Sequence, residues 1–289
     1  MQKQKVSIMQ RKNISFYGGI LFIFVFFSCI GIQYLTNLGH LQSINTNVLE
    51  SQLFRSTPLS DDMIEFLQGK EDPGLYVGTY WIMTNFEQEP LHEKLSEELF
   101  QNKIEQYSFV DGWDSYIEIC RSIWNDVKYF PIPKASNQTD ASISYVNSWM
   151  YERNYGKKRG HEGTDLMAEK QERGYYPIVS MTDGVVRHKG WLEQGGWRIG
   201  IAAPNGAYFY YAHLDSYANL EEGDIVKAGD LLGYMGDTGY SKIEGTTGNF
   251  PIHLHLGIYL NEGENEISIN PYPILKAVEH SKIKCEYSQ

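Results

Sequence analysis

The stretch FPIHLHLGIYL, residues 250–260, indicates a β-strand that carries chemistry on one face. Successive side chains of a strand point to opposite faces, so His253 and His255 would share one face and Leu254 and Leu256 the other. The leucines predict contact with a core. Two imidazoles on one face of a buried strand are costly unless they bind something or are hydrogen-bonded. The stretch therefore predicts either a ligand-binding pair or a pair of hydrogen-bonded structural histidines.

The segments before this stretch repeat the same strand-like pattern. Residues 177–190 (PIVSMTDGVVRHKG) and 196–214 (GWRIGIAAPNGAYFYYAHL) are apolar runs broken by glycine-containing turns. Asn205-Gly206 lies between two alternating apolar runs, which is a strong indication of a hairpin. We expect a compact antiparallel β domain over residues 129–289.

Most of the histidines fall in this domain, at positions His161, His188, His213, His253 and His255. His161 and Asp165 lie four residues apart in HEGTD, and the intervening Gly163 favours a tight loop that would bring them together. His188 stands between two basic residues and is expected to be a surface residue. Imidazole and carboxylate ligands without cysteine are typical of zinc, and a catalytic zinc site has three protein ligands and an open position. Surplus histidines could then serve as general base and oxyanion stabiliser.

Taken in order, these motifs resemble those of the LytM/lysostaphin-type zinc metallopeptidases, which cut peptide bonds in bacterial peptidoglycan. The family pattern H-x-G-x-D is present as HEGTDL at 161–166, and the later H-x-H as HLHLG at 253–257. Between them lie YAHL at 211–214 and the glycine-rich run GDIVKAGDLLGYMGDTG at 223–239. The resemblance covers about residues 145–289, and the N-terminal 128 residues do not share it.

The resemblance implies that His161, Asp165 and His255 bind one zinc ion and that His213 and His253 are the catalytic pair. One of the pair would accept the proton of the attacking water and the other would stabilise the oxyanion, with the two roles left open between them. The fold it implies is an antiparallel β-sandwich with a groove whose floor holds the metal, and the loop at 241–250 would form one wall. No key position is substituted, so an active peptidase on peptidoglycan peptides is expected, with the bond that it cuts left open.

Two other functions fit parts of the sequence. The same fold could hold a partner protein without catalysis, which would suit a membrane-tethered chain with a helical module. A carrier-type barrel-sandwich domain would need a modifiable side chain at a hairpin tip, and Lys227 lacks the flanking methionines typical of such a site. Turnover of a cross-linked peptide distinguishes the peptidase from both alternatives.

The amino terminus predicts a membrane anchor. Residues 1–13 carry a formal charge of +4, and the stretch from Ile14 to Leu35 has no charged side chain. About 20 apolar residues suffice for a helix to span a bilayer, and the basic flank predicts a cytoplasmic tail with the rest exported. A cleaved signal peptide and a lipoprotein signal modified at Cys29 are the alternatives. We expect a retained signal-anchor helix over 14–35 in a single-pass protein of a bacterial cell membrane, with the C-terminal domain outside the cytoplasm.

Two segments link this expected anchor to the β domain. Residues 36–57 show no sustained periodicity and are expected to form a stalk. Residues 58–128 are expected to form a small acidic helical module, because apolar residues recur at helical spacing. The clearest stripe is Trp113, Tyr116, Ile117, Cys120, Trp124 and Val127. The module carries no catalytic motif, and whether it has a protein partner is left open.

Charge is distributed unevenly along the chain. The formal net charge is −11, and residues 50–128 alone hold 16 acids and 6 bases. An acidic protein lacks the basic footprint that phosphate binding requires, which excludes nucleic acid as the main partner. Three cysteines cannot form a disulfide framework, although Cys120 and Cys285 could pair or remain free on the exported side.

Overall fold

A computed structural model of the 289-residue chain describes residues 17–32, 48–87, 91, 93–137, 141–155, 157–260 and 266–287. The chain divides into two compact units, Met1–Asn45 and Thr46–Gln289. Each unit is described by itself.

The first unit corrects the expectation of a membrane-spanning helix over 14–35. Its described part is a helix over residues 17–32. Among the described residues, none of the helices combines the length and the apolar character that a bilayer crossing requires. The expected transmembrane element of the fold is therefore wrong. The basic tail, 1–13, lies outside the described residues, as does 36–47 of the expected stalk.

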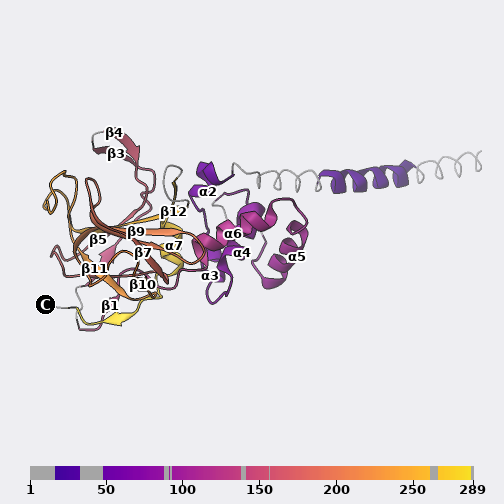
Figure 1. The fold of residues 1–289 in the computed structure, drawn as a ribbon. Helices are drawn as coiled ribbons and strands as arrows, with labels where there is room; N and C mark the ends of the chain where they lie inside the picture. Colours follow the sequence, from indigo (N-terminus) through magenta and orange to yellow (C-terminus); the bar gives the residue numbers. More distant parts are fainter. Residues whose placement is uncertain are drawn as a thin grey trace, which may run out of the picture. The chain divides into compact units, whose positions relative to one another are not determined.

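The second unit begins with a helical module (Figure 1). Its elements are η1 (Val48–Glu50), α2 (Gln52–Arg55), α3 (Asp61–Phe66), α4 (Pro73–Met83), α5 (Glu97–Tyr107) and α6 (Trp113–Trp124). Four of these helices begin after a residue whose side-chain oxygen accepts a hydrogen bond from the backbone amide three residues further on. These residues are Ser51, Ser60, Asp72 and Ser96. Such caps satisfy amides that have no partner within the helix, so the polar residues fix where α2, α3, α4 and α5 begin.

The apolar stripe expected in α6 is confirmed, because five of its six residues, Trp113 to Trp124, are buried. The stripe packs against α4, where Gly78 allows a close approach: a Cβ there would lie 2.8 Å from Cδ1 of Ile117. The hydroxyl of Tyr116 donates to the carbonyl oxygen of Gly78 at 3.0 Å. Cys120 is buried in this contact, and all three cysteines are free, so Cys120 and Cys285 do not pair.

The last part of the expected stalk belongs to this module. Phe54 of α2 is fully buried, and its ring centroid lies 5.2 Å from that of Trp81 and 6.3 Å from that of Tyr116. The lack of a sustained periodicity here reflects the shortness of α2, which is one helical turn long.

A mainly β domain follows, as expected. Its strands are β1 (Lys134–Ala135), β2 (Ile143–Ser144), β3 (Glu152–Tyr155), β4 (Lys157–Gly160), β5 (Thr164–Ala168), β6 (Pro177–Val179), β7 (Gly184–Leu192), β8 (Gly196–Ala202), β9 (Tyr208–Tyr217), β10 (Ile225–Val226), β11 (Leu231–Met235), β12 (His253–Leu260), β13 (Ile267–Ile269) and β14 (Lys284–Cys285). A short helix, α7 (Tyr272–Ala277), follows β13.

Ten of these strands form one antiparallel sheet with the order β10-β7-β8-β9-β12-β5-β2. The sheet branches, because β11 pairs with both β6 and β9, and β13 pairs with β12. The predicted hairpin joins β8 to β9, with Asn205-Gly206 in its turn and Gly206 at a φ of 101°. The remaining strands make two small sheets, a parallel pair β1–β14 and an antiparallel hairpin β3–β4.

The two faces of the central strands differ in chemistry. Leu254 and Leu256 of β12 are fully buried, as are Phe209 and Tyr211 of β9 and Ile199 of β8. These residues alternate with the polar ones, as the period of two in a strand requires. The core therefore lies on one face of β8, β9 and β12, and the other face is left to carry the site.

Candidate active site

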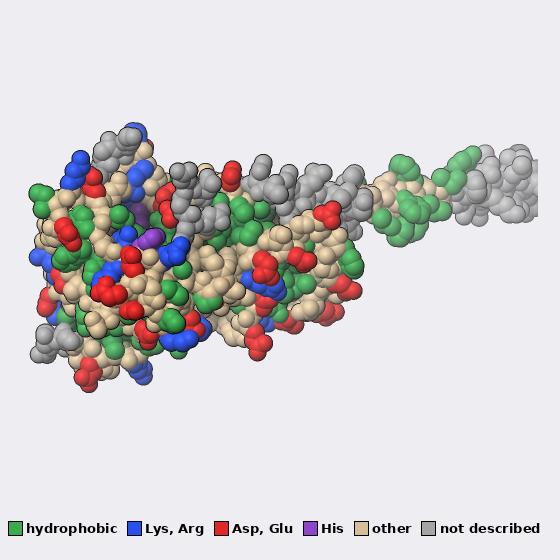
Figure 2. All heavy atoms as spheres, viewed as in Figure 1, with side chains coloured by type: hydrophobic (Ala, Val, Ile, Leu, Met, Phe, Trp, Pro, Cys, Tyr) green, Lys and Arg blue, Asp and Glu red, His purple; other side chains and the backbone are tan. Residues whose placement is uncertain are grey.

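The pairing of β12 with β5 brings the first two motifs together. His255 lies directly opposite Asp165 in the antiparallel register, and His253 lies opposite Met167. Directly opposed residues share a face of the sheet, so His253, His255 and Asp165 all face away from the leucines of β12. Figure 2 shows histidine side chains in a hollow on the surface of the β domain.

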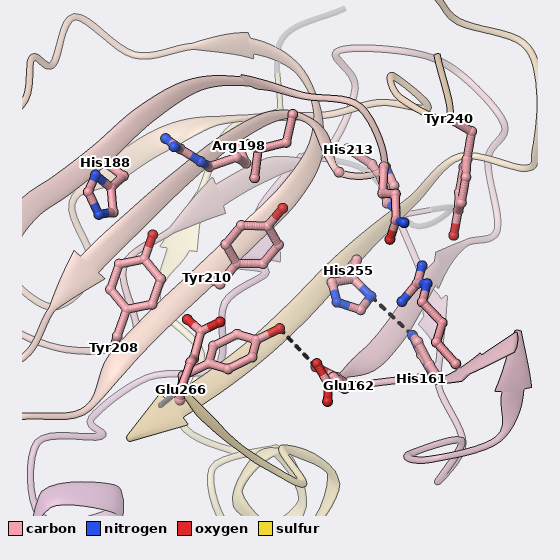
Figure 3. Close-up of a pocket in the computed structure, with 15 residues that line it drawn as sticks. His161, Glu162, His188, Arg198, Tyr208, Tyr210, His213, Tyr240, His255 and Glu266 are labelled. Atoms are coloured by element: carbon pink, nitrogen blue, oxygen red, sulfur yellow. Dashed lines mark hydrogen bonds between the residues drawn. The ribbon is translucent and has the colours of Figure 1, made fainter. Parts of the chain in front are cut away.

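Three atoms form a nearly equilateral triangle at this point. Nε2 of His161 lies 3.0 Å from Oδ1 of Asp165 and 3.0 Å from Nδ1 of His255, and the last two atoms are also 3.0 Å apart. The dashed line in Figure 3 marks the contact between the two imidazoles. Zinc at about 2.0 Å from each ligand atom in tetrahedral geometry would separate those atoms by about 3.3 Å. The donor set and the triangle therefore fit one zinc ion, with a fourth position open.

Further contacts hold these ligands in place. Nδ1 of His161 is 3.2 Å from the carbonyl oxygen of Ser148 and 3.1 Å from Nη2 of Arg153. When Nδ1 carries the proton and donates it to that carbonyl, the lone pair of Nε2 is left for the metal. The second carboxylate oxygen of Asp165 accepts a hydrogen bond of 2.7 Å from Arg153. Burial alone would raise the pKa of Asp165, but hydrogen bonds from His161 and His255 hold this pKa well below its usual range. The carboxyl group is thus an anion ready to bind a cation.

His213 reaches the site through a local change of backbone conformation. Its neighbour Ala212 is opposite His255, so a regular strand would turn residue 213 toward the core. Instead His213 has a φ of 63°, in the left-handed region, where the register of β9 with both β8 and β11 shifts. A bulge of this kind re-aims a side chain. Its amide donates to Gly195 at 2.8 Å and its carbonyl accepts from Gly236 at 2.9 Å, which stabilises the unusual conformation.

The expected catalytic pair, His213 and His253, is in contact, with ring centroids 4.7 Å apart. Each Nδ1 lies 2.7 Å from a carbonyl oxygen, that of Thr238 for His213 and that of Pro251 for His253. In both rings this makes Nε2 the proton acceptor. Burial and the neighbouring histidines lower the pKa of His213 well below its usual value, and burial lowers the pKa of His253. Both imidazoles are therefore neutral near pH 7 and able to take a proton.

The loop expected as a groove wall, 241–250, contacts this pair through Phe250. The ring centroid of Phe250 lies 4.6 Å from that of His213 and 5.1 Å from that of His253. Tyr240, just before the loop, stacks on His213 at 5.8 Å and lines the cavity. Aromatic packing thus restricts how the two imidazoles can turn.

A cavity of about 310 Å³ extends from the metal triangle across the sheet. It is lined by His161, His213 and His255 and also by Arg198, Tyr208 and Tyr210 (Figure 3). His188, expected to be a surface residue, is exposed but lines this cavity as well. The sequence interpretation missed Arg198. Its signal was the alternation Trp197-Arg198-Ile199, in which the burial of Ile199 turns Arg198 to the histidine face.

The chain is similar to several known proteins. Residues 39–126 match the LytM N-terminal domain and residues 159–271 match peptidase family M23. The L-Ala–D-Glu endopeptidase of Bacillus subtilis is 44% identical over 151 residues, 52% of this chain and 43% of that protein. Lysostaphin of Staphylococcus simulans is 33% identical over 108 residues, 37% of this chain and 20% of that protein. The chain thus spans less than half the length of the curated relatives it matches.

One solved structure is similar to this chain over most of its length. It is a LytM protein of Ruminococcus gnavus assigned as a glycyl-glycine endopeptidase, with 61% identity and a TM-score of 0.81. The match covers 86% of this chain and 99% of that one. Because identity is this high over almost the whole of that chain, and because the His-Asp-His group fits a metal, the chain belongs to the M23 family of zinc peptidases.

Proposed function

We propose that this protein is a zinc endopeptidase that hydrolyses peptide bonds in bacterial peptidoglycan, and that its β domain acts outside the cytoplasm, where that polymer lies. The observation that carries the proposal is the juxtaposition of two sites. A metal triangle formed by His161, Asp165 and His255 lies beside a pair of neutral imidazoles, His213 and His253.

When bound, zinc supplies a Lewis acid that polarises the scissile carbonyl and lowers the pKa of water. The chain supplies the proton transfers. Nε2 of His213 or His253 takes the proton of the attacking water, while the Nδ1 hydrogen bond to Thr238 or Pro251 keeps that ring oriented. The imidazolium so formed can donate to the developing oxyanion and then return the proton to the leaving amine.

Two bonds are candidates, since relatives are named as an L-Ala–D-Glu endopeptidase and as glycyl-glycine endopeptidases. The first bond lies in the stem peptide and the second in a glycine cross-bridge. Both should be offered to the enzyme as defined muropeptides, with the new termini identified by mass spectrometry.

The decisive variant is His255→Ala, assayed on purified cell wall for new peptide termini. We expect zinc content to fall and cleavage to fall more than about 100-fold, because even the outer partners of metal ligands contribute 10- to 100-fold. His280→Ala is a matched control, since His280 is exposed and lies outside the cavity. Wild-type cleavage by the His255→Ala protein would refute the proposal. A zinc-loaded wild-type protein that cleaves no muropeptide would instead favour the alternative of a non-catalytic interaction protein.

A further inference from the structure

The end of the cavity away from the metal triangle is built on β7, β8 and β9. In the sheet register Gly200 pairs with Tyr210 of β9 and with His188 of β7, so these side chains share the face that carries His255. Arg198, two residues before Gly200 on β8 and paired with Gly190, belongs to the same face. The sheet topology therefore places one guanidinium in the groove, two strands away from the metal-binding strand β12.

No carboxylate of the described residues forms an ion pair with Arg198. One terminal nitrogen of its guanidinium, Nη1, is buried and has no hydrogen-bond partner there. The side chain is half-buried and lines the cavity. Withdrawing a cation from water without a partner costs free energy. An anion brought in by a ligand would offset this cost.

The hydroxyl of Tyr210 lies close enough to this guanidinium for the two groups to interact electrostatically, and Tyr208 lines the same cavity. The Tyr208 hydroxyl reaches over Gly200 and the Tyr210 hydroxyl reaches over Gly195, so that a methyl group at either glycine would collide with the facing hydroxyl. Figure 3 shows Arg198 in the same part of the cavity as Tyr208 and Tyr210, on the side away from His161. Burial raises the pKa of Tyr210, so its hydroxyl stays protonated and can donate. A guanidinium flanked by phenolic donors matches the two acceptor oxygens of a carboxylate.

The other charges of the cavity come from different elements. Arg159 lies on β4, Glu162 directly follows His161, and Glu266 precedes β13. Glu162 has a cation of its own nearby, Nη2 of Arg55 at 3.8 Å. Among these charged residues of the cavity, Arg198 is thus the one that lies on the central strands forming the floor of the groove.

We propose that Arg198, together with the hydroxyl of Tyr210, forms a carboxylate-binding subsite that makes this enzyme select acidic peptides over uncharged ones such as polyglycine. The subsite deepens the function proposed above and rests on it. Strands in a sheet are about 4.8 Å apart, so β8 lies about 10 Å from β12. The recognised carboxylate therefore belongs to a residue within a few positions of the scissile bond, and a glutamyl residue of a stem peptide has the required chemistry.

The test uses two pairs of synthetic peptides with the zinc-loaded full chain. The first pair differs only in an internal glutamyl residue, with a free carboxylate or as its amide, and the second only in a free or amidated C-terminus. We expect wild-type protein to prefer the internal carboxylate by about 10- to 100-fold in kcat/KM, as for hydrogen bonds to charged groups. Arg198→Gln should remove this preference by raising KM for the carboxylate peptide more than KM for its amide, while Arg198→Lys should keep part of the preference.

The matched control is Arg187→Gln, which removes the same charge from an exposed position of β7 outside the cavity lining. It should preserve the preference.

A second readout is calorimetric binding of the same peptides to metal-free protein, in which cleavage plays no part. If binding discriminates but nothing is cleaved, the subsite stands and the proposed catalysis fails. The subsite would be overturned if wild-type protein showed the same kcat/KM and the same binding for the two members of each peptide pair. It would also be overturned if Arg198→Gln lowered kcat/KM equally for the carboxylate peptide and for its amide. A preference confined to the second pair would assign Arg198 to a chain end and overturn the internal glutamyl assignment.

Discussion

Gly163 lies directly against the imidazole of His255: a Cβ at this position would stand 2.5 Å from Cε1 and 2.6 Å from Nε2 of that ring. The same atom would also lie 2.5 Å from the carbonyl oxygen of Leu256. Real Cβ atoms do not approach other atoms so closely, so no side chain fits at the glycine of the H-x-G-x-D motif. Its absent side chain is what allows β12 to bring His255 into the triangle with His161 and Asp165.

Replacing Gly163 by alanine should therefore displace a metal ligand. We expect zinc affinity to fall about 10- to 100-fold, measured by competition with a chromophoric chelator. The free energy of unfolding of the metal-free protein should fall by about 1–3 kcal/mol, since overpacking forces nearby groups to shift. Gly206→Ala is the control, because Gly206 has a positive φ but nothing within 4 Å of its Cβ position. That variant should lose stability and keep its zinc affinity; equal zinc affinities for all three proteins would contradict the steric account.

Zinc removal should destabilise the folded protein. The three metal ligands, His161, Asp165 and His255, lie close together, which is unfavourable without a cation between them. A ligand that binds only the folded state raises the free energy of unfolding, and it does so more at higher ligand concentration. Zinc at about 1,000 times its dissociation constant should add about 4 kcal/mol to the free energy of unfolding. Thermal melts with zinc and with chelator measure this difference.

The variant His255→Ala should lose most of this zinc-dependent stabilisation, whereas His280→Ala should retain it. If chelator leaves the melting temperature of wild-type protein unchanged, His161, Asp165 and His255 do not hold a metal in the folded state.

Much of the β domain followed from local sequence. The alternation around His253 and His255 predicted their shared face, and the buried leucines between them confirm the assignment of the core. Asn205-Gly206 predicted a hairpin because few residue pairs adopt the backbone conformation of a tight turn. These features depend on neighbours in the chain, which a single sequence displays directly.

The position of His213 could not be read in this way. Alternation along β9 assigns residue 213 to the core face, and only the left-handed backbone turns its ring toward His253. The resemblance to zinc peptidases supplied its role before any pattern in the strand did. Arg198 was missed for a related reason: its significance depends on the lack of a facing carboxylate among the described residues, which is a property of the assembled sheet.

The membrane-spanning element was predicted from an uncharged apolar stretch of sufficient length behind a basic flank, and proved wrong. Residues 14–35 are apolar and uncharged, which satisfies a length criterion that counts residues. The structure describes a helix there over residues 17–32, and among the described residues no helix is long and apolar enough to cross a bilayer.

Arg55 links the helical module to the β domain. Its Nη2 donates to Oγ of Ser268 at 2.6 Å and its Nε donates to the carbonyl oxygen of the same residue at 3.0 Å. Hydrogen bonds from charged donors contribute about 1.5–3 kcal/mol where they are shielded, and this side chain is 22% exposed. We expect Arg55→Met to lower the free energy of unfolding in urea by about 1–2 kcal/mol.

A double-mutant cycle isolates this contact. Arg55→Met and Ser268→Ala should show a coupling energy above about 0.5 kcal/mol, the limit within which independent sites add. Arg55→Met combined with Lys70→Met is the control pair, because Lys70 bonds Glu97 instead. Additive effects for Arg55 and Ser268 would show that the backbone carbonyl, which remains in Ser268→Ala, accounts for the whole contact.

The start of α4 predicts a defined pH dependence. Asp72 caps this helix through the amide of Leu75 and pairs with Arg121, whose Nη2 lies 2.7 Å from its Oδ2. Partial burial would raise the pKa of Asp72, but the hydrogen bonds from Arg121 and Asn125 outweigh it, so the pKa is lower than in the unfolded chain. A carboxyl with a lowered folded pKa contributes stability above its unfolded pKa, near 4, and this contribution is lost as the pH falls through the folded pKa.

The variant Asp72→Asn keeps a good helix cap but loses the charge. At pH 7 we expect it to be less stable than wild type by about 1 kcal/mol, a value reduced for a partly exposed ion pair. The difference should shrink as the pH falls below the unfolded pKa, near 4, and through the lower folded pKa of Asp72, because the carboxyl group then becomes protonated in the wild type too. Urea unfolding at several pH values measures it, with Asp62→Asn in the exposed first turn of α3 as control. A wild-type advantage over Asp72→Asn that persists unchanged from pH 7 to pH 2.5 would show that the cap, and not the charge of Asp72, stabilises this helix start.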